Sequence, residues 1–255
     1  MTMPSRLFRY ETISLQTLRN LKNQVVYFGA PRNFNDPYDC AIAAAIGDLS
    51  DDGLNHLLSG VQVNASADQL KALYKDAATK TLSEIAESFL DKRGVSCFTE
   101  KNDNLLMWSH YADGGRGICL EFKASDALFE KAKKVNYVES IPLLSLDRML
   151  CDKSYDDVME LFRTKSKAWE YEQEWRVMHE TAGTSWCYDS AALTGIYFGP
   201  STPDDLINII CLILGGQNEH VQFYRGSRNS EQFRVDFIQF NYTSHLNAIR
   251  LGLKS

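Results

Sequence analysis

Alternating and helically spaced apolar residues divide the chain into short strands and amphipathic helices. Alternation and runs of β-branched or aromatic residues predict strands at residues 7–10, 25–28, 95–98, 118–122, 135–138, 170–179, 194–199 and 233–242. Apolar residues three or four apart predict helices that begin at Ser14 and Ser125 and helices over 48–92, 104–111, 147–167 and 203–212. The order of these elements predicts an α+β fold with mixed or antiparallel sheets.

The block at residues 48–92 is mostly helical and separates two strand-rich parts of the chain. We find no repeat, low-complexity segment or linker, so the pattern predicts one α+β domain over residues 1–255 with a helical insertion at about 48–92. The composition, 44% hydrophobic and 24% charged, is typical of a globular protein with a substantial core.

Charge and hydropathy narrow the classes of function. The formal net charge of −6 argues against a basic surface over the whole molecule for nucleic acid. A local basic groove stays open, and its candidate residues are Lys22, Arg32, Arg93, Lys101 and Arg116. The chain has no run of eighteen apolar residues and no signal peptide, so we expect a cytoplasmic protein without membrane contact.

Cysteine and histidine positions give little sign of metal or cofactor chemistry. The six cysteines are scattered and the five histidines are isolated, which favours free thiols and no metal site. Neither a P-loop nor a dinucleotide-binding glycine motif is present. A hydrolase would need His110 within hydrogen-bond reach of Cys97 or Cys119, and no motif supports that pairing.

The most unusual segment, residues 169–176, carries three glutamates between two tryptophans. On a continuous strand, Glu170, Glu172 and Glu174 would share one face. Such a row of carboxylates is either a solvated sheet edge or a site. A carboxylate on a rigid strand can accept a hydrogen bond from a ribose hydroxyl or stabilise an oxocarbenium-like centre, as glycosyl transfer requires.

Several other residues have side chains suited to a ligand site, although each has an ordinary structural role as an alternative. Arg9 offers a bidentate fork for a phosphate, and Ser96 shares a strand face with the aromatic ring of Phe98. The strand at 7–10, the loop at 34–39 and the helix at 104–111 add the polar or aromatic candidates Tyr10, Phe34, Asn35, Asp36, Trp108 and Tyr111.

Taken together, these motifs resemble those of a bacterial family of uncharacterised proteins. The motifs are Phe-Asn-Asp-Pro-Tyr-Asp at 34–39, Ser-Cys-Phe-Thr-Glu at 96–100, Met-Trp-Ser-His-Tyr-Ala at 107–112, Gly-Ile-Cys-Leu-Glu-Phe at 117–122 and Trp-Glu-Tyr-Glu-Gln-Glu-Trp-Arg at 169–176. The resemblance covers residues 6 to about 200, and it assigns no activity.

The order of Arg9, Ser96 and Glu172-Gln173-Glu174 also resembles, more distantly, that of ADP-ribosyltransferases. This resemblance implies an ADP-ribosyltransferase-like fold, with NAD as substrate and no metal. It places Arg9 near the phosphates or ribose of NAD and Ser96 near the nicotinamide ribose. Glu174 would bind the ribose hydroxyl and stabilise the oxocarbenium-like state, with Glu172 as its catalytic neighbour. Cys97 and Phe98 replace part of the Ser-Thr-Ser run that is usual in that family.

The sequence therefore predicts an NAD-dependent ADP-ribosyltransferase, a bacterial toxin or phage-defence effector. It would modify a macromolecule, either nucleic acid or protein, and an antitoxin or other inhibitory protein could accompany it. The alternative is a non-enzymatic partner-binding or sensor domain, in which the carboxylates form a recognition edge and the tryptophans anchor an interface.

Overall fold

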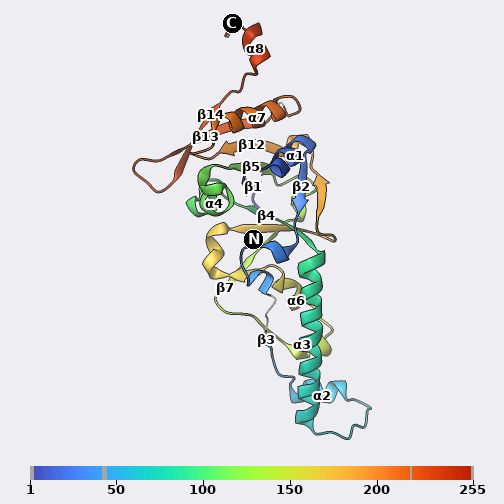
Figure 1. The fold of residues 1–255 in the computed structure, drawn as a ribbon. Coiled ribbons are helices and arrows are strands. Elements are labelled where there is room, and N and C mark those ends of the chain that lie inside the picture. The colour runs from blue at the N-terminus through green and yellow to red at the C-terminus, as the bar shows by residue number, and fades with distance from the viewer. Residues whose placement is uncertain (1–2, 42–44, 219, 254–255) are drawn as a thin grey trace.

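An eight-stranded mixed sheet forms the centre of this α+β protein in a computed structural model that describes residues 3–41, 45–218 and 220–253 (Figure 1). Its strand order is β14-β13-β12-β5-β1-β4-β10-β6. The strands in chain order are β1 (Arg6–Glu11), β4 (Gly94–Thr99), β5 (Ile118–Lys123), β6 (Lys133–Lys134), β10 (Glu174–His179), β12 (Leu193–Phe198), β13 (Gln222–Arg228) and β14 (Val235–Phe240).

Neighbouring strands of this sheet run antiparallel except for one pair. Strands β12 and β13 are parallel, and the helix α7 (Asp204–Gly215) connects them, as a parallel pair requires. Together with α1 (Leu15–Asn23), α7 packs on one sheet face, where Leu21 and Ile210 join the main core. The helix α4 (Leu105–Tyr111) packs on the other face, where Trp108 lies against Tyr10.

The helices that lie away from the main sheet share a second, smaller core. Helix α3 (Ala67–Lys92) extends away from the sheet, and α2 (Asp51–Leu57) lies near its far end (Figure 1). Two short helices from later in the chain, α5 (Leu146–Leu150) and α6 (Asp156–Leu161), contribute to the same core, which includes Leu54, Leu82, Leu146 and Leu161. The C-terminal helix α8 (His245–Arg250) lies at the opposite end of the molecule.

Three small two-stranded sheets complete the strand pairing. Strand β2 (Val25–Phe28) pairs with β11 (Thr184–Cys187), β3 (Ala45–Ile46) with β8 (Leu143–Leu144), and β7 (Asn136–Val138) with β9 (Thr164–Ser166). The second and third pairs are parallel, and β9 lies 28 residues after its partner β7, as Thr164 pairs with Asn136. This pairing brings Lys165 of β9 next to the main sheet at β10.

Most of the predicted strands and helices are confirmed, and the exceptions are informative. The helix expected at 147–167 is wrong: this segment forms two short helices followed by β9, and Tyr155 between the helices is exposed. The helix expected from Ser125 is replaced by turns and the 3-10 helix η4 (Phe129–Lys131). In both segments tertiary packing overrides a short apolar repeat.

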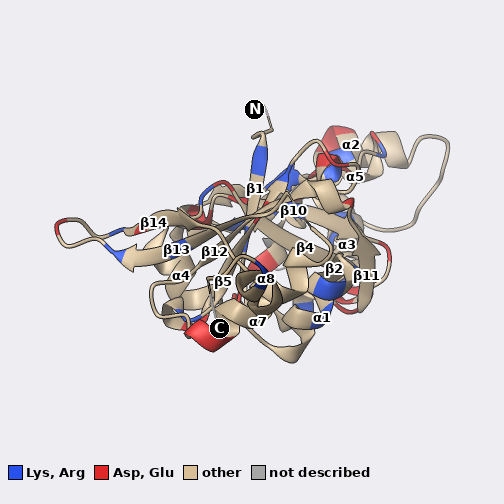
Figure 2. Cartoon of the chain, turned by 90° about the horizontal axis from the view of Figure 1, so that it is seen from above, with Lys and Arg blue, Asp and Glu red and all other residues tan. Residues whose placement is uncertain are grey.

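Charged side chains are dispersed over several elements rather than gathered on one of them (Figure 2). Of the residues proposed for a basic groove, Arg32 pairs with Glu87 and Asp91, and Arg116 pairs with Asp113. Within the described residues, no helix combines the length and apolar character that crossing a membrane requires.

Candidate functional site

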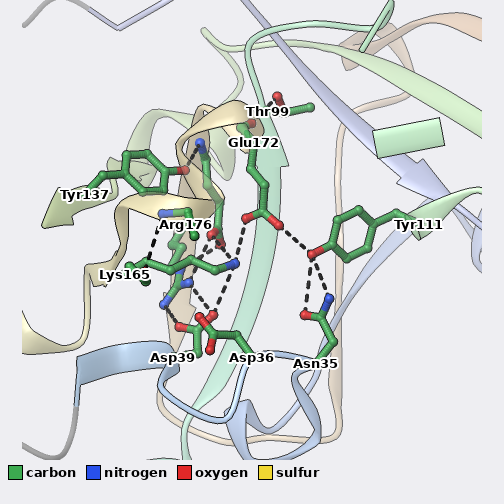
Figure 3. Close-up of polar contacts among 12 residues, drawn as sticks. Asn35, Asp36, Asp39, Thr99, Tyr111, Tyr137, Lys165, Glu172 and Arg176 are labelled. Carbon is green, nitrogen blue, oxygen red and sulfur yellow. Dashed lines mark hydrogen bonds and ion pairs between the residues drawn. The ribbon is translucent and has the colours of Figure 1, made fainter. Parts of the chain in front are cut away.

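Five buried ionisable side chains form one network where β10 begins (Figure 3). The Lys165 ammonium nitrogen lies at its centre, 2.6 Å from Oε2 of Glu172 and 3.4 Å from Oε2 of Glu174. It also lies 3.4 Å from Oδ2 of Asp39. Asp39 lies far in the sequence from Glu172 and Glu174, so the fold places the three carboxylates around a single cation.

Arg176 is the second cation of this network and is fully buried. Its Nε donates to Oε1 of Glu174 at 2.7 Å, and its Nη2 donates to Oε2 of the same residue at 3.0 Å. Its Nη1 lies 2.6 Å from Oδ1 of Asp39, and it also donates to the main-chain oxygen of Phe162 at 3.2 Å. Bidentate contact with Glu174 fixes that carboxylate in place.

The two glutamates experience different electrostatic environments. Burial acts to raise the pKa of Glu174, but the adjacent Arg176 and Lys165 cations outweigh it and lower the pKa to about 2. Burial raises the pKa of Glu172, and Lys165 only partly opposes that rise. Glu174 is therefore a firmly ionised partner of Arg176, whereas Glu172 holds its negative charge less firmly.

Besides Lys165, residues of α4 and β4 contact Glu172 and position it. The Tyr111 hydroxyl on α4 donates to Oε1 of Glu172 at 2.5 Å. The Asn35 amide donates to the same hydroxyl at 3.1 Å. The Thr99 hydroxyl on β4 donates to the main-chain oxygen of Glu172 at 2.5 Å. The hydrogen bonds of its hydroxyl therefore connect Tyr111 to Asn35 and to the buried network at Glu172.

The local backbone differs from the continuous strand expected over residues 170–175, and that expectation is wrong. Residues Lys167–Glu172 form the 3-10 helix η5, and β10 begins only at Glu174. Gln173 between them is left-handed, with φ 46° and ψ 50°. Glu170 is exposed on η5, while Glu172 and Glu174 are buried. The solvated-edge alternative therefore does not describe these two residues.

A cavity of about 250 Å³ lies beside the network. Strands β1 and β4 are paired only at Phe8 and Thr99, and residues on both sides of that pair line the cavity. Its walls include the predicted residues Arg9, Tyr10, Phe34, Asn35, Phe98, Tyr111, Glu172 and Glu174, and also Tyr27, Asp39, Cys97 and Lys165. The site thus combines aromatic rings with buried carboxylates.

Not every predicted site residue reaches this cavity. Ser96 is buried outside it and accepts a hydrogen bond from Arg9. Because Thr99 pairs with Glu174 and side chains alternate along β4, Ser96 and Glu174 project from opposite sheet faces. Trp108 is buried against Tyr10 and donates to the main-chain oxygen of Asn102. The sequence order of Arg9, Ser96 and Glu174 is therefore not a convergent side-chain triad.

Asp36 does not line this cavity but a neighbouring one, which Phe34 also lines. Its Oδ1 accepts a hydrogen bond from the main-chain N–H of Tyr38 at 2.9 Å. This is the turn-forming bond expected of an Asp that precedes a proline.

Sequence patterns did not identify Lys165, Asp39 or Arg176 as members of the site. Lys165 lies in a segment whose apolar spacing suggested a helix, and nothing local marks it as buried. Asp39 and Arg176 belong to motifs that were recognised, and each is the charged last residue of its motif. The available signal was that both motifs end in a charged residue, of opposite sign in the two motifs.

The carboxylates of the network surround a cation of the protein itself. Among the described residues, no group of three or more His, Cys, Asp or Glu side chains has metal-binding geometry. The Lys165 ammonium instead lies among the three carboxylates. His110 packs near the rings of Trp169 and Tyr171, and in the described residues it has no hydrogen bond to a cysteine.

Comparison with known proteins supports part of the resemblance. Residues 107–177 match a family described as "Protein of unknown function (DUF2971)". This confirms the resemblance to an uncharacterised domain family over that range, which includes Tyr111, Lys165, Glu172, Glu174 and Arg176. No curated protein and no solved structure, of an ADP-ribosyltransferase or otherwise, matches the chain.

Proposed function

We propose that this protein cleaves the N-glycosidic bond of NAD in the 250 Å³ cavity and transfers ADP-ribose to a macromolecular acceptor or to water. The observation that carries the proposal is an excess of buried negative charge beside aromatic walls. Asp39, Glu172 and Glu174 supply three carboxylates, whereas Lys165 and Arg176 supply two cations. Such a site favours a compact organic cation.

The chemistry of NAD fits this charge distribution. Its nicotinamide ring is a pyridinium cation, and the ribose carbon becomes oxocarbenium-like as the C1′–N bond breaks. The bonding electrons leave with nicotinamide, which departs as a neutral molecule. Water or an acceptor then bonds to C1′ and loses a proton, which gives ADP-ribose or the modified acceptor. A fixed carboxylate beside C1′ would stabilise this transition state.

Glu172 is the residue that we propose acts on the ribose. Its single ion pair to Lys165 and its hydrogen bond from Tyr111 leave it less constrained than Glu174, which Arg176 holds at both oxygens. Glu174 then acts as a positioning residue. Arg9 lines the same cavity, where it pairs with Glu11 and donates to Ser96, and in this proposal it would contact the ribose or phosphate side of NAD.

The size of the cavity limits what it encloses. A volume of about 250 Å³ is below the range of about 300–1,000 Å³ typical of complete small-molecule sites. We therefore propose that the nicotinamide ribose enters the cavity and that the adenosine end lies outside it. Phe34, Tyr27 and Phe98 would provide aromatic contacts.

The test is nicotinamide release by the full chain, measured by chromatography after incubation with NAD, with transfer of labelled ADP-ribose to lysate in parallel. We expect Glu172→Gln to lower the rate at least about 100-fold, the effect of losing an electrostatic transition-state contact. Glu170→Gln is the matched control, because Glu170 is exposed on the same 3-10 helix. If the wild-type protein neither releases nicotinamide nor transfers label, the proposal is wrong.

The second candidate is a binding module without catalysis. It is favoured by the Lys165 ammonium, which already satisfies part of the charge of Glu172 and Glu174. This function predicts saturable binding of NAD or nicotinamide without bond cleavage. Calorimetry measures the binding, and chromatography of the same samples shows whether nicotinamide is released.

A further inference from the structure

A second and larger cavity adjoins the first one. Its volume is about 610 Å³, and it shares Phe34, Asp39 and Lys165 with the smaller cavity. These three side chains therefore form a partition between the two spaces. The proposed reaction uses only the smaller cavity, so the larger one is without an assigned role.

Asp36 is the unusual side chain in the wall of the larger cavity. It is 6% exposed, and Oδ1 is used by the turn bond from Tyr38. Its Oδ2 is buried and has no hydrogen-bond donor among the described residues. A buried carboxylate oxygen without a donor is unfavourable, so this oxygen indicates a missing partner.

The charges around this cavity determine the sign of that partner. Asp36, Asp39 and Glu139 contribute carboxylates to its lining. Its two cations are already paired: Lys165 with the buried network, and Arg32 with Glu87 and Asp91. Asp39 and Glu139 are paired as well, with Arg176 and Lys167. Asp36 is therefore the charged side chain of the described lining without a partner of opposite sign, and it favours a cationic ligand.

The remaining walls are mostly apolar. Pro31, Pro37, Leu90, Val138 and Pro142 line the cavity. Tyr38 and Ile141 also contribute, and they are 63% and 50% exposed. An apolar wall of this kind suits an aliphatic stem, whereas the buried acid requires a charged head group.

We propose that this cavity is a binding site for a guanidinium or ammonium group carried on an apolar stem, with Asp36 as its anionic partner. The charged head donates to Asp36, and the stem lies against the proline and aliphatic walls. The source is either a free small cation or an arginine or lysine side chain of a protein partner. This inference does not depend on cleavage of NAD.

The direct experiment is isothermal titration of the full chain without NAD, using N-butylguanidinium as the free cation and a short acetylated, amidated peptide with one central arginine as the protein-like ligand. The same peptide with citrulline is the neutral control. We expect saturable binding of at least one cationic probe and at least tenfold weaker binding of the citrulline peptide. Tighter binding of the peptide than of N-butylguanidinium assigns a protein side chain, and the reverse order assigns a free cation.

Two variants test the assigned partner. Asp36→Asn keeps an oxygen for the Tyr38 N–H but removes the charge, and we expect at least tenfold weaker binding. Asp48→Asn removes the same charge at a position outside the cavity, where Asp48 pairs with Lys75, and should bind within twofold of wild type. Ile141→Lys places a competing cation at a half-exposed wall position and should weaken binding even if Asp36→Asn folds poorly.

Three results would overturn the inference: no saturable binding by the wild type, equal binding of the citrulline peptide, or full binding by both folded variants. The proposed reaction can fail separately, because Glu172→Gln should bind the cationic probes as the wild type does. Glu172 does not line the larger cavity.

Discussion

The ammonium nitrogen of Lys165 lies 2.6 Å from Oε2 of Glu172, and both side chains are almost fully buried. The two residues occupy consecutive elements, β9 and η5. Strand β9 is fixed by its parallel pairing with β7, and η5 is fixed by the hydrogen bond from Thr99 to the main-chain oxygen of Glu172. Burial alone acts to lower the pKa of Lys165, but the surrounding Glu174, Asp39 and Glu172 carboxylates raise it. Lys165 therefore remains charged and holds the site together.

Removal of that cation should destabilise the fold. Lys165→Met leaves three buried carboxylates with Arg176 as their only charged partner in the network, so we expect a loss of about 3–5 kcal/mol in the free energy of unfolding. Urea unfolding followed by circular dichroism measures it. Lys75→Met is the control, because its pair with Asp48 is exposed to solvent and should contribute little to stability. Equal losses in both variants would contradict a structural role for the buried network.

Stability should fall in acid because of Glu174. Its pKa is about 2 in the folded protein, against a usual 4.5, so its contribution is complete above pH 4.5 and is lost as the pH falls from 4.5 towards 2. Glu172 acts in the opposite sense: its raised pKa gives a contribution that is complete below 4.5 and is lost as the pH rises through its folded value. Carboxyl-carbon NMR should find Glu174 still ionised at about pH 3. A measured pKa of Glu174 near the usual 4.5 would contradict this prediction.

The Tyr111 hydroxyl should control the ionisation of Glu172. Burial raises the pKa of Glu172, Glu174 adds to the rise, and the Lys165 charge and the Tyr111 hydrogen bond oppose it. Tyr111→Phe removes one opposing contact and should raise that pKa further. Glutamate-labelled NMR titration measures the shift, and Tyr155→Phe, at an exposed position, should leave it unchanged. No difference between the two variants would mean that the hydroxyl does not stabilise the carboxylate.

Gln173 should tolerate glycine but not a β-branched residue. Its φ of 46° lies in the left-handed region, which a residue branched at Cβ occupies only with strain. Gln173→Val should lower the free energy of unfolding by about 1–2 kcal/mol, and Gln173→Gly should change it by less than about 1 kcal/mol. Thermal unfolding of the two variants at the same pH provides the comparison. A valine variant as stable as the glycine variant would contradict this local conformation.

Much of the fold was predictable because strong local patterns decide strands and capped helices. Ser14 caps α1 as expected, since its hydroxyl accepts from the N–H of Thr17. The helical character of 48–92 is also confirmed by α2 and α3. The segment at 147–167 could not be predicted, because β9 pairs with β7 some 28 residues earlier, as Asn136 with Thr164. Local spacing carries no information about such a partner.

Sequence alone determined which segments of this protein are unusual: the 34–39 loop, the 96–100 and 107–112 motifs, and the glutamates of 169–176. Tertiary structure alone decided which of their side chains meet. The order of Arg9, Ser96 and Glu174 along the chain does not reveal which face of the sheet each side chain occupies. In the structure, Ser96 and Glu174 project from opposite faces of the sheet. Burial of Lys165 and Arg176 among the carboxylates likewise depends on strand pairings that bring distant segments together. The physical reason is that charge, burial and pKa are properties of neighbours in space.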